Sequence, residues 1–401
     1  MLSAVRQKYE HTIYACYIGY ITQAIVNNFA PLLFLTFVSD YGLGLDKITM
    51  ITTVNFLVQL VVDLVSARVI DRVGYRRAVM FAHLMAAVGL IGMAVLPGLH
   101  GDAYAGILIS VVCYAIGGGI IEVLISPIVE ACPTSKKEGA MSLLHSFYCW
   151  GHLAVVLLST LFFQVFGIGN WQIMAVIWAA VPVANLFYFS QVPIYPIVSE
   201  HEKLSLGGLL KNKMFWLIVV LMICAGASEQ AMSQWASSFA ESALKVSKTV
   251  GDLAGPCAFA LCMGTARALY GKFSDSIPLR PAMGACAVLC IGCYAVAIFA
   301  PNPVLGLVGC AVTGFSVGIF WPGTFSVAAG QIPNGGTAMY ALLALAGDLG
   351  CSSGPTVVGL AANANQGNLK TGLGAAMLFP AVMLIGILLL GRVKLKGSGH
   401  K

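Results

Sequence analysis

The chain alternates between long apolar runs and short polar stretches along almost its whole length. Each apolar run is long enough to cross a bilayer as a helix, since a span needs about 20 residues. The pattern therefore predicts an all-α membrane protein with twelve transmembrane helices. The predicted spans lie near residues 12–38, 48–70, 76–97, 104–129, 139–166, 171–193, 214–239, 250–273, 280–300, 303–329, 336–363 and 371–391.

The twelve runs fall into two groups of six whose sequences are related. A motif from Asp63 to Asp71 closes the second run, and an equally spaced motif from Arg267 to Asp275 closes the eighth. Parallel repeats of this kind are a known transporter plan, with the binding site between the two halves near the middle of the membrane. The sequence predicts two pseudo-symmetric six-helix bundles at residues 1–198 and 214–401, joined by a polar cytoplasmic linker at 199–213.

The composition excludes a water-soluble fold. The chain is 59% hydrophobic and only 9% charged, whereas about 25% of the residues of a soluble domain are charged. The net charge of +6 comes from basic residues in short loops, which indicates membrane orientation rather than nucleic-acid binding. Eighteen of the 22 Lys and Arg residues fall on one side of the predicted helices. This distribution predicts a multi-pass cell-membrane protein with both termini in the cytoplasm. We expect a monomer, although the sequence itself does not determine the oligomeric state.

The loop between the second and third runs carries a sequence typical of a transporter family. Residues 67–77 read Ala-Arg-Val-Ile-Asp-Arg-Val-Gly-Tyr-Arg-Arg. This segment resembles the signature G-x-x-x-D-R-x-G-R-[RK] of the major facilitator superfamily, with Ala67 in place of the first glycine. The resemblance implies the major facilitator fold and a charge network that closes the cytoplasmic face in the outward-open state. In that network Asp71 would accept hydrogen bonds at a helix N-terminus of the opposite half, beside Arg72, Arg76 and Arg77.

The fourth and fifth runs resemble a narrower branch, the fucose:proton symporters. Glu122 and Pro127 match that branch's Glu-x4-Pro, and residues 143–151 match its L-A-Q-T-F-N-x-x-G segment, which lines the sugar pocket. Glu122 takes the place of the proton-linked glutamate. His145 and Tyr148 stand where the branch has Gln and Asn.

The first run departs from the same branch. The branch has N-N-x-N-D, whereas residues 27–31 here read Asn-Asn-Phe-Ala-Pro. The paired asparagines are kept and the aspartate is lost. The resemblance therefore implies a sugar-type pocket that lacks the second protonatable residue on this helix.

Three carboxylates within apolar runs are candidate proton-coupling residues, namely Glu122, Glu229 and Asp348. An ionisable group inside a bilayer costs about 2.5–3.5 kcal/mol on insertion scales and is kept mainly where it faces a cavity or another helix. Burial disfavours the charged form of a carboxyl group, so such a residue can exchange a proton as its access to water alternates. The alternative is structural, either a bond to a neighbouring helix or, for Asp348, the cap of a broken helix.

Charged residues toward the cytoplasmic ends of the spans form a second set. Asp63 and Arg267 occupy equivalent positions in the two halves with opposite charge. Ion pairs there would form and break as the protein changes state. The candidate gating residues are Asp63, Asp71, Arg72, Arg76, Arg267 and Asp275.

Polar and aromatic residues within the spans are candidates for binding a solute. On the seventh run Glu229, Gln230 and Gln234 form a polar ridge beside Trp235, and on the first run Tyr20, Gln23 and Asn27 share one helix face. Sugars are bound by such sets, with polar side chains for hydroxyl groups and a ring for C–H groups. Hydrogen bonding between helices and plain packing are the alternatives. The candidates are Tyr20, Gln23, Asn27, Asn28, His145, Tyr148, Gln230, Gln234, Trp235 and Trp321.

Together these features predict a secondary active transporter rather than an enzyme. The sequence carries no nucleotide-binding loop or metal-ligand cluster, so we expect no cofactor and no metal. We expect import of a small polar solute, a sugar or polyol, by proton symport and alternating access. A proton-coupled exporter of amphipathic compounds and a non-transporting sensor are the alternatives, and sodium coupling stays open.

Overall fold

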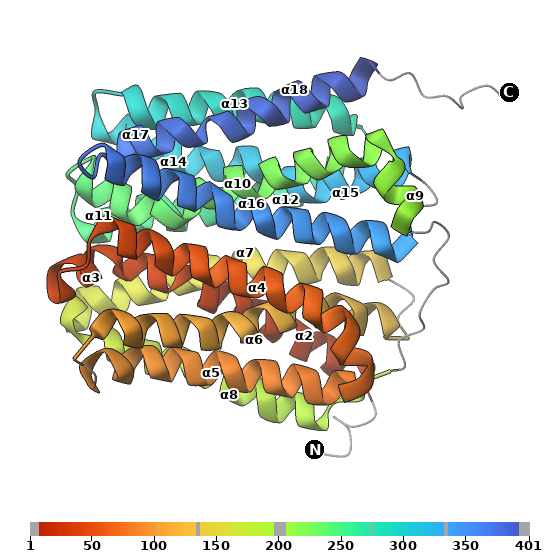
Figure 1. Ribbon diagram of the computed structural model, residues 1–401, viewed down its shortest axis with the longest axis horizontal. Helices are drawn as coiled ribbons and strands as arrows, with labels where there is room; N and C mark the ends of the chain where they lie inside the picture. Colours follow the sequence, from red (N-terminus) through yellow and green to blue (C-terminus); the bar gives the residue numbers. More distant parts are fainter. Residues whose placement is uncertain are drawn as a thin grey trace, which may run out of the picture.

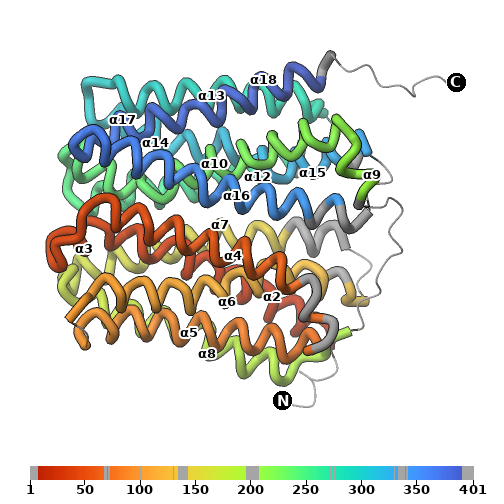
Figure 2. The backbone as a smooth tube through the Cα atoms, in the orientation of Figure 1, coloured from red at the N-terminus to blue at the C-terminus, as the bar shows by residue number. Residues whose placement is uncertain are grey.

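The computed structural model describes residues 8–99, 101–133, 137–195, 206–273, 276–332 and 336–392, and Figure 2 draws the uncertain parts of the chain in grey. The first half contains α2 (Tyr9–Asn28), η1 (Ala30–Leu33), α3 (Phe34–Tyr41), α4 (Leu45–Val73), α5 (Tyr75–Leu99), α6 (Ala103–Ala131), α7 (Lys137–Phe166), η2 (Ile168–Asn170) and α8 (Trp171–Gln191). The short helix α9 (Leu206–Lys211) falls in the segment predicted as a linker.

The second half has more interruptions within its spans. It contains α10 (Lys213–Ser242), α11 (Lys248–Asp252), the π-helical turn η3 (Leu253–Cys257), α12 (Ala258–Phe273), α13 (Leu279–Phe299), α14 (Pro303–Val317), α15 (Phe320–Gln331), α16 (Gly336–Ala364), α17 (Leu369–Ala376) and α18 (Leu378–Arg392).

The predicted all-helical architecture is confirmed for the described residues. Within the described ranges, ten segments are long and apolar enough to cross a membrane. Residues 248–273 (α11, η3 and α12) and α16 supply two more segments of spanning length, which gives the twelve that the sequence predicts. These two segments contain Arg267 and Asp348, two of the charged residues within the membrane region.

The helices form two groups that lie side by side (Figure 1). Helices α2 to α8 make one group and α10 to α18 the other, and the start of α2 and the end of α18 lie at the same end of the molecule. The opposite end, where α3 and α11 lie, is called the far end below.

Side-chain caps fix where several helices begin. Asp102 accepts hydrogen bonds from two amides at the start of α6, and Asn212, Asn302 and Asn368 each cap α10, α14 and α17 in the same way. Asn and Asp are favoured here because their oxygens satisfy amides that have no partner within the helix. The polar residues between apolar runs therefore mark the helix starts.

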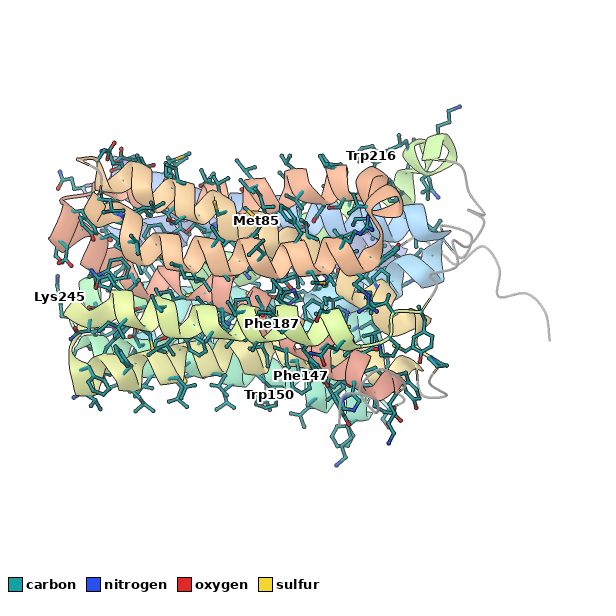
Figure 3. All side chains as sticks on the ribbon, turned by 90° about the horizontal axis from the view of Figure 1, so that it is seen from below. Met85, Phe147, Trp150, Phe187, Trp216 and Lys245 are labelled. Carbon is teal, nitrogen blue, oxygen red and sulfur yellow. The ribbon has the colours of Figure 1, made fainter. Side chains whose placement is uncertain are left out.

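The outer surface of the bundle is apolar along the helices (Figure 3). Trp150, Phe187 and Trp216 are 44%, 61% and 50% exposed. A soluble protein rarely exposes so much continuous apolar surface. This surface faces lipid in a multi-pass membrane protein.

The two halves meet through direct polar contacts near the far end. The hydroxyl groups of Thr53 on α4 and Thr356 on α16 are 2.5 Å apart, and Thr249 on α11 donates to Gln164 on α7 at 2.6 Å. Next to the first of these contacts, Gly359 packs directly against Thr49, in a space that a Cβ atom would overlap. The halves are thus closely packed at this end.

Candidate solute and proton site between the two halves

A polar cavity of about 100 Å³ lies between the halves, and four helices from each half contribute to its wall. The contributing helices are α2, α4, α6 and α7 on one side and α10, α12, α15 and α16 on the other. The lining residues are Tyr20, Gln23, Asn27, Phe56, Glu122, His145, Tyr148, Glu229, Gln230, Arg267, Trp321, Asp348 and Cys351.

Glu122 of α6 lines this cavity and is partly buried. The side chain of Gln23 on α2 donates a hydrogen bond to Glu122 Oε2 at 2.5 Å. A neutral amide can hold this carboxyl group in place whether or not it carries a proton, because the donor needs only an acceptor oxygen. Glu122 is therefore positioned by a group that does not fix its charge.

Glu229 of α10 and Arg267 of α12 form an ion pair in the cavity wall, with 3.4 Å between Glu229 Oε2 and the Arg267 guanidinium. Arg267 also donates to the carbonyl of Gly318 at 3.1 Å and contacts Cys149 Sγ at 3.1 Å. Gly318 follows the last residue of α14, where helix carbonyls lack amide partners and attract cations. Arg267 thus connects both halves at the cavity.

Asp63 of α4 and Asp348 of α16 face each other across the boundary between the halves, with their carboxyl groups within hydrogen-bonding reach. Asp348 is only 4% exposed. Asp63 Oδ1 and Asp348 Oδ2 accept from no donor in the described part of the chain. Two carboxyl groups so close make a favourable contact only when they share a proton.

A polar stripe on α4 continues from this pair and was not singled out from the sequence. Asn55 and Gln59 donate to Asn27 Oδ1 at 3.1 and 2.8 Å. Asn55, Gln59 and Asp63 are spaced by four residues, so they share one face of α4. This spacing within an apolar run is the signal that could have identified them.

The main chain of Asn27 makes a contact between the halves. Proline has no N–H group, so Pro31 cannot donate to the carbonyl four residues earlier. Gln234 of α10 instead donates to this Asn27 carbonyl at 3.0 Å. Gln234 also donates to Gln230 Oε1 at 3.1 Å.

Several of the predicted solute-binding residues line the cavity together. Tyr20 is within 3.0 Å of Ser126 Oγ, and its ring lies 5.4 Å from that of His145. His145 lines the cavity, and its accessible surface faces the cavity. His145 lies near the start of α7, which is the end of that helix closest to the termini.

Trp321 of α15 covers Gly347, next to Asp348. A Cβ atom at residue 347 would overlap the indole ring, so this contact requires glycine. The ring also lies edge-on to Phe325 with 6.3 Å between centroids. The glycine-rich segment of α16 thus makes room for an aromatic side chain in the cavity wall.

Three predicted solute-binding residues lie behind the cavity wall. Asn28 donates to the Tyr148 hydroxyl at 3.3 Å, and the Trp235 indole donates to the Pro355 carbonyl at 2.9 Å. Gln234 is engaged with Asn27 as described above. Phe56 and Cys351 line the cavity without having been predicted, since an apolar residue in an apolar run gives no signal.

Of the predicted gating residues, Arg267 lines the cavity, and Asp63 faces Asp348, which lines it. Arg76 donates to the carbonyls of Phe189 and Val192 at 2.6 and 2.7 Å, which caps the end of α8 within its own half. A surface hollow of about 400 Å³ lies beside it. Asp275 and the side chains of Asp71 and Arg72 lie outside the described part of the chain.

The sequence from residue 16 to 355 matches the family model of the Major Facilitator Superfamily. The chain belongs to this family. It is accordingly a membrane transporter and not an enzyme.

Individual relatives are more distant. The membrane protein MosC of Rhizobium meliloti is 24% identical over 282 residues, which cover 70% of this chain and 66% of that protein. The chain is similar in structure to a bacterial homologue of the human lysosomal transporter Spinster (TM-score 0.76, 15% identity, 96% and 98% of the two chains). It is also similar to the D-xylose-proton symporter (TM-score 0.73, 14% identity, 95% and 96%).

The fucose:proton symporter of E. coli, the branch that the sequence resembles, is also among the similar structures. Its TM-score is 0.65 at 14% identity, over 94% of this chain and 98% of that one. At this level of identity the likeness concerns the fold.

Proposed function

We propose that this protein is a proton-coupled secondary transporter that imports a small polar solute, such as a sugar or polyol, through the cavity between its halves. The observation that carries the proposal is the grouping of three acidic sites around one cavity. Glu122, the Glu229–Arg267 pair and Asp348 all line it, together with amide and hydroxyl groups. An acidic group beside a solute site can couple proton uptake to solute binding.

The nature of the wall supports a small polar solute. Its amides and hydroxyl groups, including Gln23, Gln230 and Tyr148, are suited to sugar hydroxyls, and Trp321 offers a ring to C–H groups. A volume of about 100 Å³ is below the range of about 300–1,000 Å³ for pockets that hold drug-sized ligands. Both features favour this reading over the export of amphipathic compounds.

Glu122 is assigned the exchange of the proton. Its contact with Gln23 persists in either charge state, while its charge is felt by Glu229 and Asp348 in the same wall. Loading a proton on Glu122 reduces this repulsion and lets the two halves approach around the solute. The proton symport of the structurally similar D-xylose transporter supports the same coupling here.

The orientation assigned from the basic residues indicates which state of the transport cycle this structure represents. With the termini in the cytoplasm, the packed far end is extracellular, and access to the cavity is assigned to the cytoplasmic side. The protein described here is thus assigned the inward-facing state.

A thermal-shift screen of the purified protein tests the proposal. The panel contains monosaccharides, polyols, nucleosides and amphipathic cations, each at an acidic and a neutral pH. We expect stabilisation by a sugar or polyol, with a size that changes with pH. Stabilisation by amphipathic cations alone would favour the exporter, and sodium-dependent, pH-independent stabilisation would replace the proton as coupling ion.

A further inference from the structure

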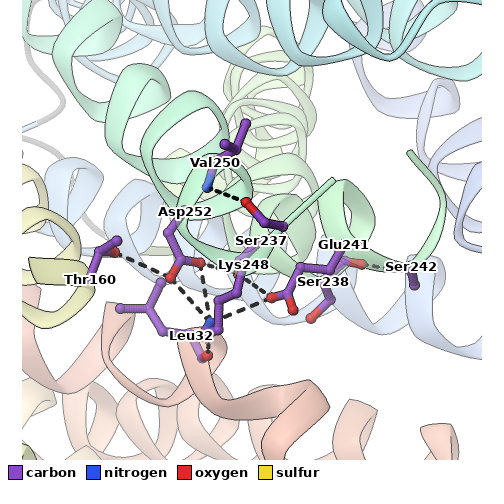
Figure 4. A network of polar contacts seen from close by, with 10 residues as sticks. Leu32, Thr160, Ser237, Ser238, Glu241, Ser242, Lys248, Val250 and Asp252 are labelled. Atoms are coloured by element: carbon purple, nitrogen blue, oxygen red, sulfur yellow. Dashed lines mark hydrogen bonds and ion pairs between the residues drawn. The ribbon is translucent and has the colours of Figure 1, made fainter. Parts of the chain in front are cut away.

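A partly buried charged cluster lies at the far end, outside the solute cavity (Figure 4). Lys248 Nζ lies 3.1 Å from Asp252 Oδ2 and 3.5 Å from Glu241 Oε1. Ser237 of α10 donates to Asp252 Oδ1, and Asp252 is fully buried. We call Glu241, Lys248 and Asp252 the α11 cluster, since two of its three members belong to that helix.

The α11 cluster binds the other half of the protein at two points. Lys248 Nζ donates to the main-chain carbonyl of Leu32 at 2.6 Å, and Thr160 of α7 donates to Asp252 Oδ2 at 3.2 Å. Figure 4 shows Leu32 and Thr160 reaching the cluster from two different ribbons of the first half. Lys248 and Asp252 therefore connect α11 to both η1 and α7 of the first half.

The local structure of α11 and of η1 positions the groups that make these contacts. Ser247 caps α11 by accepting from the amide of Val250, which places Lys248 in the first turn and Asp252 one turn later. On the other side, η1 replaces the α-helix between α2 and α3, so Leu32 lies in an interruption of the helical hydrogen bonds. A helix interruption is a common place for a carbonyl to accept from a side chain.

The contacts between the halves are hydrogen bonds to the charged groups of Lys248 and Asp252, while the Lys248–Asp252 ion pair itself lies within α11. A permanently closed interface does not need such charged groups, because apolar residues of similar volume are often at least as stabilising as a buried ion pair. What a charged contact adds is reversibility, since both groups can be hydrated when the interface opens. This property suits a contact that must break in every transport cycle.

An irregular turn follows the α11 cluster directly. Directly after Asp252 comes the π-helical turn η3, which contains Pro256 and separates α11 from α12. Such turns interrupt the regular hydrogen bonding of a helix and occur often at functional sites. The interruption thus separates the α11 cluster from α12, which carries Arg267 at the cavity.

We propose that Lys248 and Asp252 hold the far end closed while the cavity is open at the other end, and that release of Leu32 and Thr160 opens it. The proposal rests on the alternating access assigned above. In it Lys248 and Asp252 are positioning residues, because neither lines the solute cavity.

Hydrogen–deuterium exchange of the full-length protein in lipid nanodiscs tests this assignment without any solute. The variant Lys248→Met removes the donor to Leu32 while keeping much of the side-chain volume. We expect several-fold faster exchange in peptides that cover η1, α3 and α11. We also expect slower exchange around His145 near the start of α7, because opening of one end closes the other.

The matched control is Lys245→Met, which removes the same charge from an exposed residue three positions earlier. It should exchange like the wild type. Thr160→Val provides a second test, because it breaks the contact to Asp252 without leaving a charge unpaired, and it should produce the same reciprocal pattern more weakly.

Two results would overturn the proposal. Unchanged exchange in both variants would mean that the cluster does not hold the far end. Faster exchange at both ends would mean that it only stabilises the fold. A failure of the solute screen would remove the proposed solute and leave this outcome unaffected.

Discussion

Gln234 and Asn27 belong to different halves, and the side chain of Gln234 donates to the main-chain carbonyl of Asn27 at 3.0 Å. The bond exists because Pro31 leaves this carbonyl without its usual amide partner. A proline in the first helix thus creates an acceptor that the second half uses. Such a contact is sensitive to any change in the angle between the halves.

The dependence on Pro31 can be measured directly. We expect Gln234→Leu to lower the free energy of unfolding by about 1–3 kcal/mol, because it leaves a buried carbonyl unsatisfied. In a Pro31→Ala background the new amide can serve the Asn27 carbonyl, so the same substitution should cost much less. Unfolding of all four proteins in bicelles gives the difference, and an equal cost in both backgrounds would contradict the account.

Glu122→Gln tests the proton-coupling role. The amide cannot release a proton, while it still fits beside Gln23. In proteoliposomes, using the solute found in the screen, we expect uptake against a gradient to be lost and counterflow exchange to persist. Glu10→Gln, which changes an exposed glutamate near the start of α2, is the control and should accumulate solute normally. Normal accumulation by the Glu122 variant would remove the residue from the mechanism.

Asp348→Asn tests the contact between Asp348 and Asp63 across the halves. The new amide donates permanently to the Asp63 carboxylate, as a shared proton does in the wild type, and a bond to a charged group contributes about 1.5–3 kcal/mol. We expect a higher thermal midpoint and slower transport, because the halves separate less readily. Asp348→Ala provides no donor and should not raise the midpoint. Faster transport in the Asn variant would argue against a contact that opens during the cycle.

The ion pair at the cavity predicts a non-additive pattern. Arg267→Met leaves Glu229 buried without its cation, and breaking a buried pair costs about 3–5 kcal/mol. The double variant Arg267→Met with Glu229→Met removes both charges and should be more stable than the single one. Thermal midpoints of the single and double variants in detergent measure the coupling. Additive losses would show that the two residues act independently.

Gly347→Ala tests whether the Trp321 ring must pack directly against residue 347 for solute to bind. The added methyl group would overlap the indole, so the ring must move within the cavity wall. We expect the solute-induced thermal shift to be lost while the protein still folds. Gly330→Ala, where a Cβ atom meets nothing within 4 Å, is the control and should keep the shift. An unchanged solute response in the Gly347 variant would exclude Trp321 from the binding wall.

The sequence predicts the fold well because, in a membrane, each apolar run must form a helix. Without water, each backbone must satisfy its own hydrogen bonds as a helix, so hydropathy alone locates the spans. Interruptions were harder to locate. Pro31 and Pro322 are visible in the sequence, but which prolines break a helix depends on whether a neighbouring helix supplies a donor or acceptor.

Some of the residues that line the cavity could be predicted for a similar reason. Polar residues in apolar runs must find polar partners, and Glu122, Gln23 and Arg267 were recognisable on that ground. Which polar residue faces the cavity and which serves a neighbouring helix depends on helix rotation, which periodicity does not determine. Trp235 and Asn28 belong to the second kind. The α11 cluster depends on contacts between segments more than 200 residues apart, such as Lys248 and Leu32.

The polar face of α4 has a consequence for biogenesis. A helix with Asn55, Gln59 and Asp63 on one side enters a bilayer at a penalty, since an aspartate alone costs about 2.5–3.5 kcal/mol at mid-membrane. Asn27 on α2 accepts from both amides, so the preceding span satisfies two of these three side chains. Asn55 and Gln59 can therefore find their partner as soon as α2 and α4 are both in the bilayer, whereas Asp63 meets Asp348 only once α16 of the second half has been made.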